Sequence, residues 1–204
     1  MLNYLLYEIL DFVPGPLLLL PVFVLLHFLY LRDIRKTARL YIFAAYLSGI
    51  YAVTGLPSIK ELYFDPNFNF LPFVDMFYNI TDWFLNVLLF VPLGFLLPLL
   101  WTDFQKAGKT ILFGLYMSIG VELLQMFVIM RATDVDDLLL NTLGTVLGHL
   151  AFRLFRRKLP DCASDDTKEL IVVMVLTCAV MFLLEPWVTN WLWLILYDMP
   201  YFGA

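Results

Sequence analysis

The chain has 204 residues and a formal net charge of −5; 62% of its residues are hydrophobic and only 15% are charged. About 25% of the residues in a typical soluble domain are charged, so this composition excludes an ordinary soluble protein and predicts a single transmembrane domain over residues 1–204. The basic residues lie in short loops without interleaved exposed aromatic residues, which argues against a nucleic-acid partner and leaves membrane lipids as the expected one.

A transmembrane helix needs about 20 predominantly apolar residues. We expect an all-α bundle of about six such helices, with five as the alternative. The predicted helices cover residues 12–31, 40–57, 83–101, 110–130, 138–155 and 170–187. The aromatic tail 188–204 is too short for a further crossing, and we expect it to lie at the membrane interface.

The segment between the second and third predicted helices, residues 58–81, differs from an ordinary loop. It is too apolar for a solvated connection, and Pro66 and Pro72 disfavour a continuous helix. Irregular backbone at membrane depth needs protein or water to satisfy its polar groups. We therefore predict an amphipathic or re-entrant segment that lies on, or dips into, the extracellular leaflet.

Lysine and arginine residues predict the orientation. Eleven of the 13 lie in or beside the loops that follow the first, third and fifth predicted helices, whereas only Lys60 and Arg131 lie on the other side. Cytoplasmic loops are enriched in basic residues. Loops one, three and five are therefore expected in the cytoplasm, and both termini outside.

Polar side chains interrupt the apolar stretches at one end of three predicted helices. Ser118, Glu122 and Gln125 are spaced by four and three residues, so they share one helical face. A carboxylate inside a membrane helix costs roughly 2.5–3.5 kcal/mol on insertion scales, which makes a functional role more probable than an incidental one. The residues expected to meet at this extracellular end are Asn86, Ser118, Glu122, Gln125, Arg131, Asp134, Asp137 and Asn141.

Each of these residues also has a purely structural interpretation. Asn86, Ser118 and Asn141 could make interhelical hydrogen bonds, and Glu122 could be a neutral acid that only accepts and donates hydrogen bonds. Asp137, directly before Leu138, fits a helix N-cap. The small residues at Gly144/Gly148 and at Gly114/Ser118 favour close helix packing.

Several common chemistries find no support in the sequence. His27 and His149 lie near the opposite, cytoplasmic helix ends, which argues against a Ser–His pair or a histidine metal site. Clustered carboxylates can hold Mg²⁺, but their spacing here matches no metal-binding motif. We therefore predict no metal site, and the cofactor is left unknown.

The polar residues form an ordered series of short motifs over residues 67–150. The series begins with Asn69-Phe-Leu-Pro72-Phe73 and Asn86-Val-Leu-Leu-Phe90-Val-Pro92-Leu-Gly94. It continues with Ser118-x₃-Glu122-x₂-Gln125 and Arg131-x₂-Asp134-x₂-Asp137-x₃-Asn141-x₂-Gly144-x₃-Gly148. This series resembles the VanZ-like family of bacterial polytopic membrane proteins. The resemblance implies a protein of the bacterial cytoplasmic membrane that is associated with resistance to glycopeptide antibiotics, notably teicoplanin.

Three functional hypotheses follow. In the first, an outward-facing polar pocket binds a lipid-linked cell-wall precursor or the lipoglycopeptide, with Asn86, Ser118, Gln125 and Asn141 as binding residues. In the second, the protein is an intramembrane enzyme that modifies a lipid or glycolipid. Glu122 would then be the acid or base and Arg131 an anion clamp, with Asp134 and Asp137 holding a cation or orienting Arg131. In the third, a proton-coupled transporter or flippase uses Glu122 as its proton site.

Overall fold

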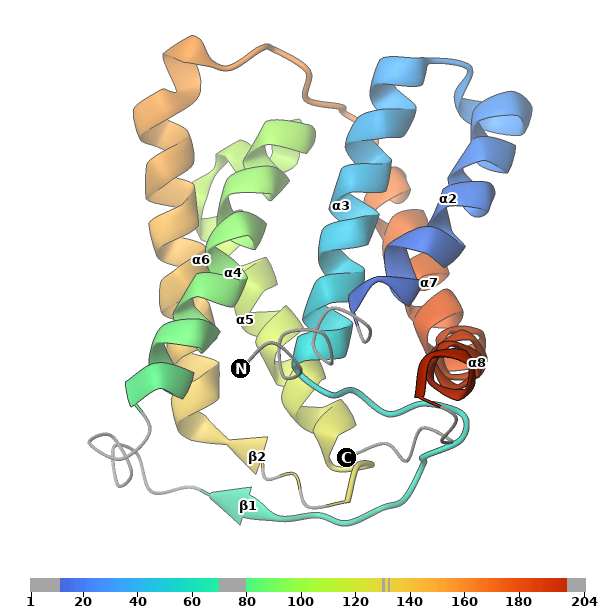
Figure 1. Cartoon of the computed structure of the whole chain (residues 1–204). Coiled ribbons are helices and arrows are strands. Elements are labelled where there is room, and N and C mark those ends of the chain that lie inside the picture. Colours follow the sequence, from blue (N-terminus) through green and yellow to red (C-terminus); the bar gives the residue numbers. More distant parts are fainter. Residues whose placement is uncertain (1–11, 70–79, 130, 132, 198–204) are drawn as a thin grey trace. The chain divides into compact units, whose positions relative to one another are not determined.

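The computed structural model describes residues 12–69, 80–129, 131 and 133–197 (Figure 1). The chain divides into two compact units. Unit 1 comprises Met1–Leu62 and Lys168–Ala204, and unit 2 comprises Tyr63–Thr167. Residues 70–79 of the predicted interfacial segment and 198–204 of the predicted aromatic tail lie outside the described residues.

Unit 1 is built from helices. Helix α2 (Pro14–Leu26) continues into a π-helical turn, η1 (His27–Leu31), and is followed by α3 (Ile34–Val53). Helices α7 (Lys168–Leu183) and α8 (Glu185–Tyr197) complete the unit, with a bend of 44° between them. The buried core includes Phe23 of α2, Phe43 of α3 and Met181 of α7.

Unit 2 contains α4 (Ile80–Leu100), the short 3₁₀ helix η2 (Thr102–Gln105), α5 (Ala107–Gln125), α6 (Val135–Phe155) and the short 3₁₀ helix η3 (Arg156–Lys158). Helices α4 and α6 lie side by side and begin at the same end of the unit, whereas α5 runs in the opposite direction (Figure 1). At that end, β1 (Phe68–Asn69) and β2 (Thr133–Asp134) form a two-residue parallel ladder in which Phe68 pairs with Thr133.

Glycine lets α4 and α6 approach until their backbones touch. A Cβ atom at Gly144 would lie 2.2 Å from the carbonyl oxygen of Val87, and one at Gly148 would lie 2.0 Å from that of Val91. Across the same interface, a Cβ at Gly94 would lie 2.0 Å from the carbonyl oxygen of Thr145. The close packing predicted for Gly144 and Gly148 is confirmed, and it fixes the register of the two helices.

The all-α membrane class is confirmed. By length and composition, four stretches among the described residues can cross a membrane, or five if α7 and α8 form one bent span. The four are Pro14–Leu31, Trp83–Leu100, Ala107–Gln125 and Val135–Lys158. The stretch predicted at 40–57 is largely helical but falls outside this set, because α3 begins at Ile34 and takes Arg35, Lys36 and Arg39 into its first two turns.

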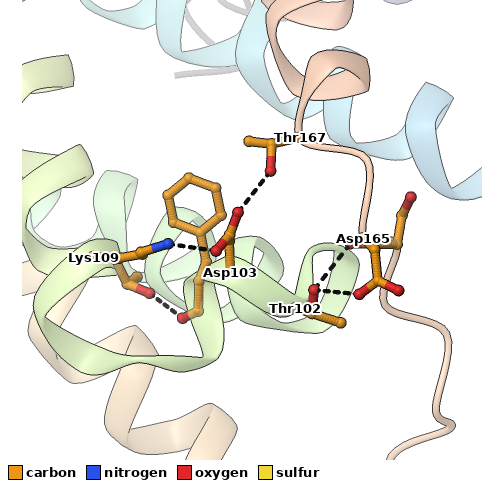
Figure 2. A network of polar contacts seen from close by, with 8 residues as sticks. Thr102, Asp103, Lys109, Asp165 and Thr167 are labelled. Carbon is orange, nitrogen blue, oxygen red and sulfur yellow. Dashed lines mark hydrogen bonds and ion pairs between the residues drawn. The ribbon is translucent and has the colours of Figure 1, made fainter.

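A network of polar contacts ties the turn between α4 and α5 to the connector that precedes α7 (Figure 2). The Asp103 carboxylate accepts hydrogen bonds from Lys109 and, at 2.9 Å, from the Thr167 hydroxyl. The Thr102 hydroxyl donates to Asp165 at 2.7 Å, and the Thr102 amide donates to the Ser164 carbonyl at 3.1 Å. The network holds the connector against η2 at the end of unit 2 opposite the β-ladder.

This network predicts an acid-sensitive contribution to stability. The bonds from Lys109 and Thr167 hold the pKa of Asp103 below its ordinary value. The contribution is therefore complete above the pKa of an unfolded aspartate, about 3.9, and is lost as the pH falls through the lower folded-state pKa. Thermal melts recorded as the pH is lowered below about 4 should show a smaller decrease in melting temperature for Asp103→Asn than for the wild type. Equal losses would show that other carboxylates account for the acid sensitivity.

Candidate functional site

Glu122 is the buried centre of a polar cluster where α5 meets the start of α6. Its side chain is 5% exposed, and its Oε2 accepts a hydrogen bond from the Asp134 amide at 2.8 Å. Its carbonyl oxygen accepts a second bond, from the Thr133 hydroxyl, at 3.1 Å. The carboxylate thus holds the strand β2 and the first turn of α6 in place.

Asp134 is the N-cap of α6. One carboxylate oxygen accepts from the Asp136 amide at 2.8 Å, and the other accepts from the Asn69 side chain at 3.1 Å. The prediction that Asp137 caps this helix is wrong, because α6 begins at Val135 and Asp137 already lies in its first turn. Asn69, Asp134 and Glu122 therefore form one chain of hydrogen bonds from β1 through β2 to α5.

Asn86 connects α4 to the same end of α6. Its side-chain amide donates a hydrogen bond to the Asp137 carboxylate. Asp137 lies in the same first turn of α6 that follows Asp134, whose amide donates to Glu122. Helices α4, α5 and α6 thus bring the amide of Asn86 and three carboxylates to one end of unit 2.

A second pair lies deeper between α5 and α6. The Asn141 side-chain amide donates to the Ser118 hydroxyl at 3.0 Å, and both side chains are buried. The Thr145 hydroxyl donates to the Asn141 carbonyl at 3.1 Å on the same side of α6. Ser118 and Asn141 thus make an interhelical hydrogen bond with each other, the structural role considered for each of them.

Replacing Ser118 with alanine should lower the free energy of unfolding by about 1 kcal/mol, because an interhelical hydrogen bond inside a membrane protein is worth about this amount. The buried Asn141 amide would lose its acceptor. Unfolding by SDS in mixed micelles measures the change, and Leu112→Ala, at an exposed position of the same helix, serves as the control for side-chain truncation. A stability equal to that of the wild type would contradict the proposed role of this bond.

The remaining predicted residues occupy different positions. Gln125 is buried at the last turn of α5, on the face that also carries Ser118 and Glu122. Arg131 is exposed in the turn before β2. The bonds shown for Asp134 and Asp137 run to Asn69, to the Asp136 amide and to Asn86. These contacts give both aspartates a role at the start of α6.

The described residues contain no group of three His, Cys, Asp or Glu side chains arranged to hold a metal ion. Among the described residues, the cluster contains carboxylate and amide oxygens that can accept hydrogen bonds, and the exposed Arg131 precedes β2 in the chain. Such groups suit a ligand that presents hydroxyl, amide or ammonium donors.

Two residues of the cluster were not among the predicted site residues. They are Asn69, which the sequence places in the Asn69-Phe-Leu-Pro72-Phe73 motif, and Thr133. Both depend on the parallel pairing of β1 with β2, which joins residues 65 positions apart. The alternation of asparagine and phenylalanine in Asn67-Phe-Asn-Phe was the available signal, because alternation is typical of a strand.

Comparison with known families decides the classification. Residues 43–156, more than half of the chain, match the family model described as VanZ/LLP1. The chain belongs to the VanZ/LLP1 family. No curated protein and no solved structure matches it. The matched region contains α4, α5 and α6 and every residue of the polar cluster. The family match therefore covers the part of this VanZ-family membrane protein in which the polar side chains meet.

Proposed function

We propose that this VanZ-family protein contributes to resistance against glycopeptide antibiotics such as teicoplanin. In this proposal the polar cluster binds a lipid-linked component of the cell envelope, or the lipoglycopeptide itself, at the outer side of the bacterial cytoplasmic membrane. The observation that supports it is the continuous set of bonds joining Asn69, Asp134 and Glu122, with Asn86 and Asp137 beside them.

The distribution of basic residues supports the outward orientation. In unit 2, Lys106 and Lys109 lie at the η2 end, and Arg156, Arg157 and Lys158 form η3 at the end of α6. The cluster lies at the opposite end. Among the described residues at that end of unit 2, Arg131 is the only lysine or arginine. The positive-inside rule then favours a cytoplasmic η2 end and an external cluster.

The chemistry of the cluster also suits such a ligand. Lipid-linked peptidoglycan precursors and lipoglycopeptides both present many hydroxyl and amide donors, and their lipid parts keep them at the membrane. Carboxylate oxygens accept bonds from such donors, and bonds to charged acceptors are worth about 1.5–3 kcal/mol each. Binding of a donor-rich headgroup is therefore favoured over binding of a bare phosphate, for which repeated cationic groups would be needed.

Expression in a glycopeptide-sensitive bacterial host tests this proposal. The minimal inhibitory concentration of teicoplanin should rise relative to an empty vector, with the protein detected in the membrane fraction. An unchanged inhibitory concentration in the presence of membrane-inserted protein would contradict the proposed function.

An intramembrane enzyme acting on a lipid or glycolipid is the second candidate. The burial of Glu122 near Asp134 and Asp137 favours this candidate. Proteins use burial and neighbouring carboxylates to adjust the pKa of a residue that acts as a general acid or base. Lipid extracts from cells that produce the wild type should then contain a modified species that is absent with Glu122→Gln. Identical extracts would exclude this version.

A further inference from the structure

The segment Tyr63–Asn69 lies along the end of α5 instead of forming a free loop. The Tyr63 amide donates to the Phe127 carbonyl at 3.0 Å, and the Asp65 amide donates to the Met126 carbonyl at 2.9 Å. The Thr133 amide donates to the Asn67 carbonyl at 2.8 Å. We call this segment, together with Phe127–Ile129, the rim.

The rim exposes large apolar side chains. Phe64 is 58% exposed, although its ring also contacts that of Phe127 with centroids 5.3 Å apart. Tyr63, Phe68 and Ile129 are exposed as well. In water, a contiguous apolar surface of this kind marks an interaction site.

The apolar surface of the rim continues onto α5. Leu123 and Leu124, in the turn of α5 that precedes the rim, are exposed, and Tyr116 is exposed further along the helix. Because α5 is one of the stretches of unit 2 that can cross a membrane, we expect its exposed apolar side chains to face lipid. The rim extends this lipid-facing surface beyond the end of the helix.

The polar groups of the rim are compatible with the same environment. Backbone bonds join the segment to Met126 and Phe127, directly after α5, and to Thr133 of β2, and such bonds help non-helical backbone to lie near lipid. The exposed Arg131 lies two positions after Ile129 in the chain. Tyrosine is enriched at membrane interfaces, and a basic side chain near a helix end can reach the lipid headgroups.

We propose that the rim is a bilayer-docking surface, with its aromatic side chains inserted at the lipid interface and Arg131 at the level of the lipid headgroups. Asn69, at the end of the rim, bonds to Asp134 of the polar cluster. Docking therefore places the cluster at the membrane surface. The ligand class follows only if the proposed function is correct. The ligand is then a lipid-anchored molecule that reaches the cluster from within the bilayer.

Site-directed spin labelling in vesicles of phosphatidylethanolamine and phosphatidylglycerol tests the docking. The background carries Cys162→Ser and Cys178→Ser, and single labels are placed at Phe64→Cys in the rim, at Leu123→Cys as the lipid-facing control and at Thr102→Cys as the aqueous control. The label at Phe64 should collide preferentially with oxygen over a water-soluble nickel chelate, as at Leu123. Tyr63→Cys provides a second rim position if Phe64→Cys does not fold.

A rim label whose collisions favour the nickel chelate, as at Thr102, would overturn the docking proposal. This outcome is independent of antibiotic resistance, because it is measured on the folded protein in vesicles without any antibiotic. A protein that docks its rim and yet gives no resistance would contradict the proposed function alone.

Discussion

Replacing Gly148 with alanine should lower the free energy of unfolding by about 1–3 kcal/mol, the usual cost of overpacking a close contact. The new Cβ would lie 2.0 Å from the carbonyl oxygen of Val91 and 2.9 Å from the Gly94 Cα. Both neighbours are backbone atoms, so no side-chain rotation can relieve the clash. Helices α4 and α6 would have to separate, and the contact between Asn86 and Asp137 at their common end would weaken with them.

Gly120 of α5 provides the matched control. Nothing lies within 4 Å of a Cβ built at this position. The same substitution there should be neutral or stabilise the protein by up to about 1 kcal/mol, because alanine is the better helix former. SDS titration of both variants in mixed micelles gives the comparison. Equal stabilities for Gly148→Ala and Gly120→Ala would mean that the α4–α6 contact is looser than described.

Two substitutions at Glu122 should separate its structural role from its functional one. Glu122→Ala removes the acceptor of the Asp134 amide and should cost about 1–3 kcal/mol, the penalty of leaving a buried donor unsatisfied. Glu122→Gln keeps a side-chain oxygen in the same place and should stay close to the stability of the wild type. Both variants should lose the protection against teicoplanin, because neither can present a carboxylate to a ligand or exchange a proton.

Asp161→Asn is the control for these substitutions, because it also replaces a carboxylate with an amide in unit 2. Asp161 is exposed, and its described contact is an ion pair with Arg156. The substitution should leave both stability and protection unchanged. If Glu122→Gln were as unstable as Glu122→Ala, the carboxylate would be needed for folding itself. A loss of protection against teicoplanin would then not demonstrate a functional role for Glu122.

Helical periodicity was sufficient to predict half of the cluster. Spacings of four and three residues put Ser118, Glu122 and Gln125 on one face, and opposite chain directions brought Ser118 to Asn141. The cap of α6 could not be assigned from the same pattern. Asp134, Asp136 and Asp137 are all reasonable cap residues, and the extended backbone of Asp134 and its bond from the Asp136 amide show that the helix begins directly after Asp134.

The contacts between residues far apart in the sequence could not be predicted from the sequence pattern. The ladder between β1 and β2 has two residues on each strand, and the alternation at residues 67–70 does not identify Thr133 and Asp134 as the partners. The network of Thr102, Asp103 and Asp165 joins exposed residues of ordinary loops. The glycines were easier to interpret, because a small residue every fourth position predicts a close helix contact, although the partner helix α4 had to be seen in the structure.

The central claim is that the cluster around Glu122 is a functional site and not only a packing element. The most direct test compares the teicoplanin inhibitory concentration of a sensitive host that produces the wild type, Glu122→Gln or Asp161→Asn at equal levels in the membrane. We expect protection by the wild type and by Asp161→Asn, and loss of protection with a stably folded Glu122→Gln. Full protection by Glu122→Gln would contradict the central claim.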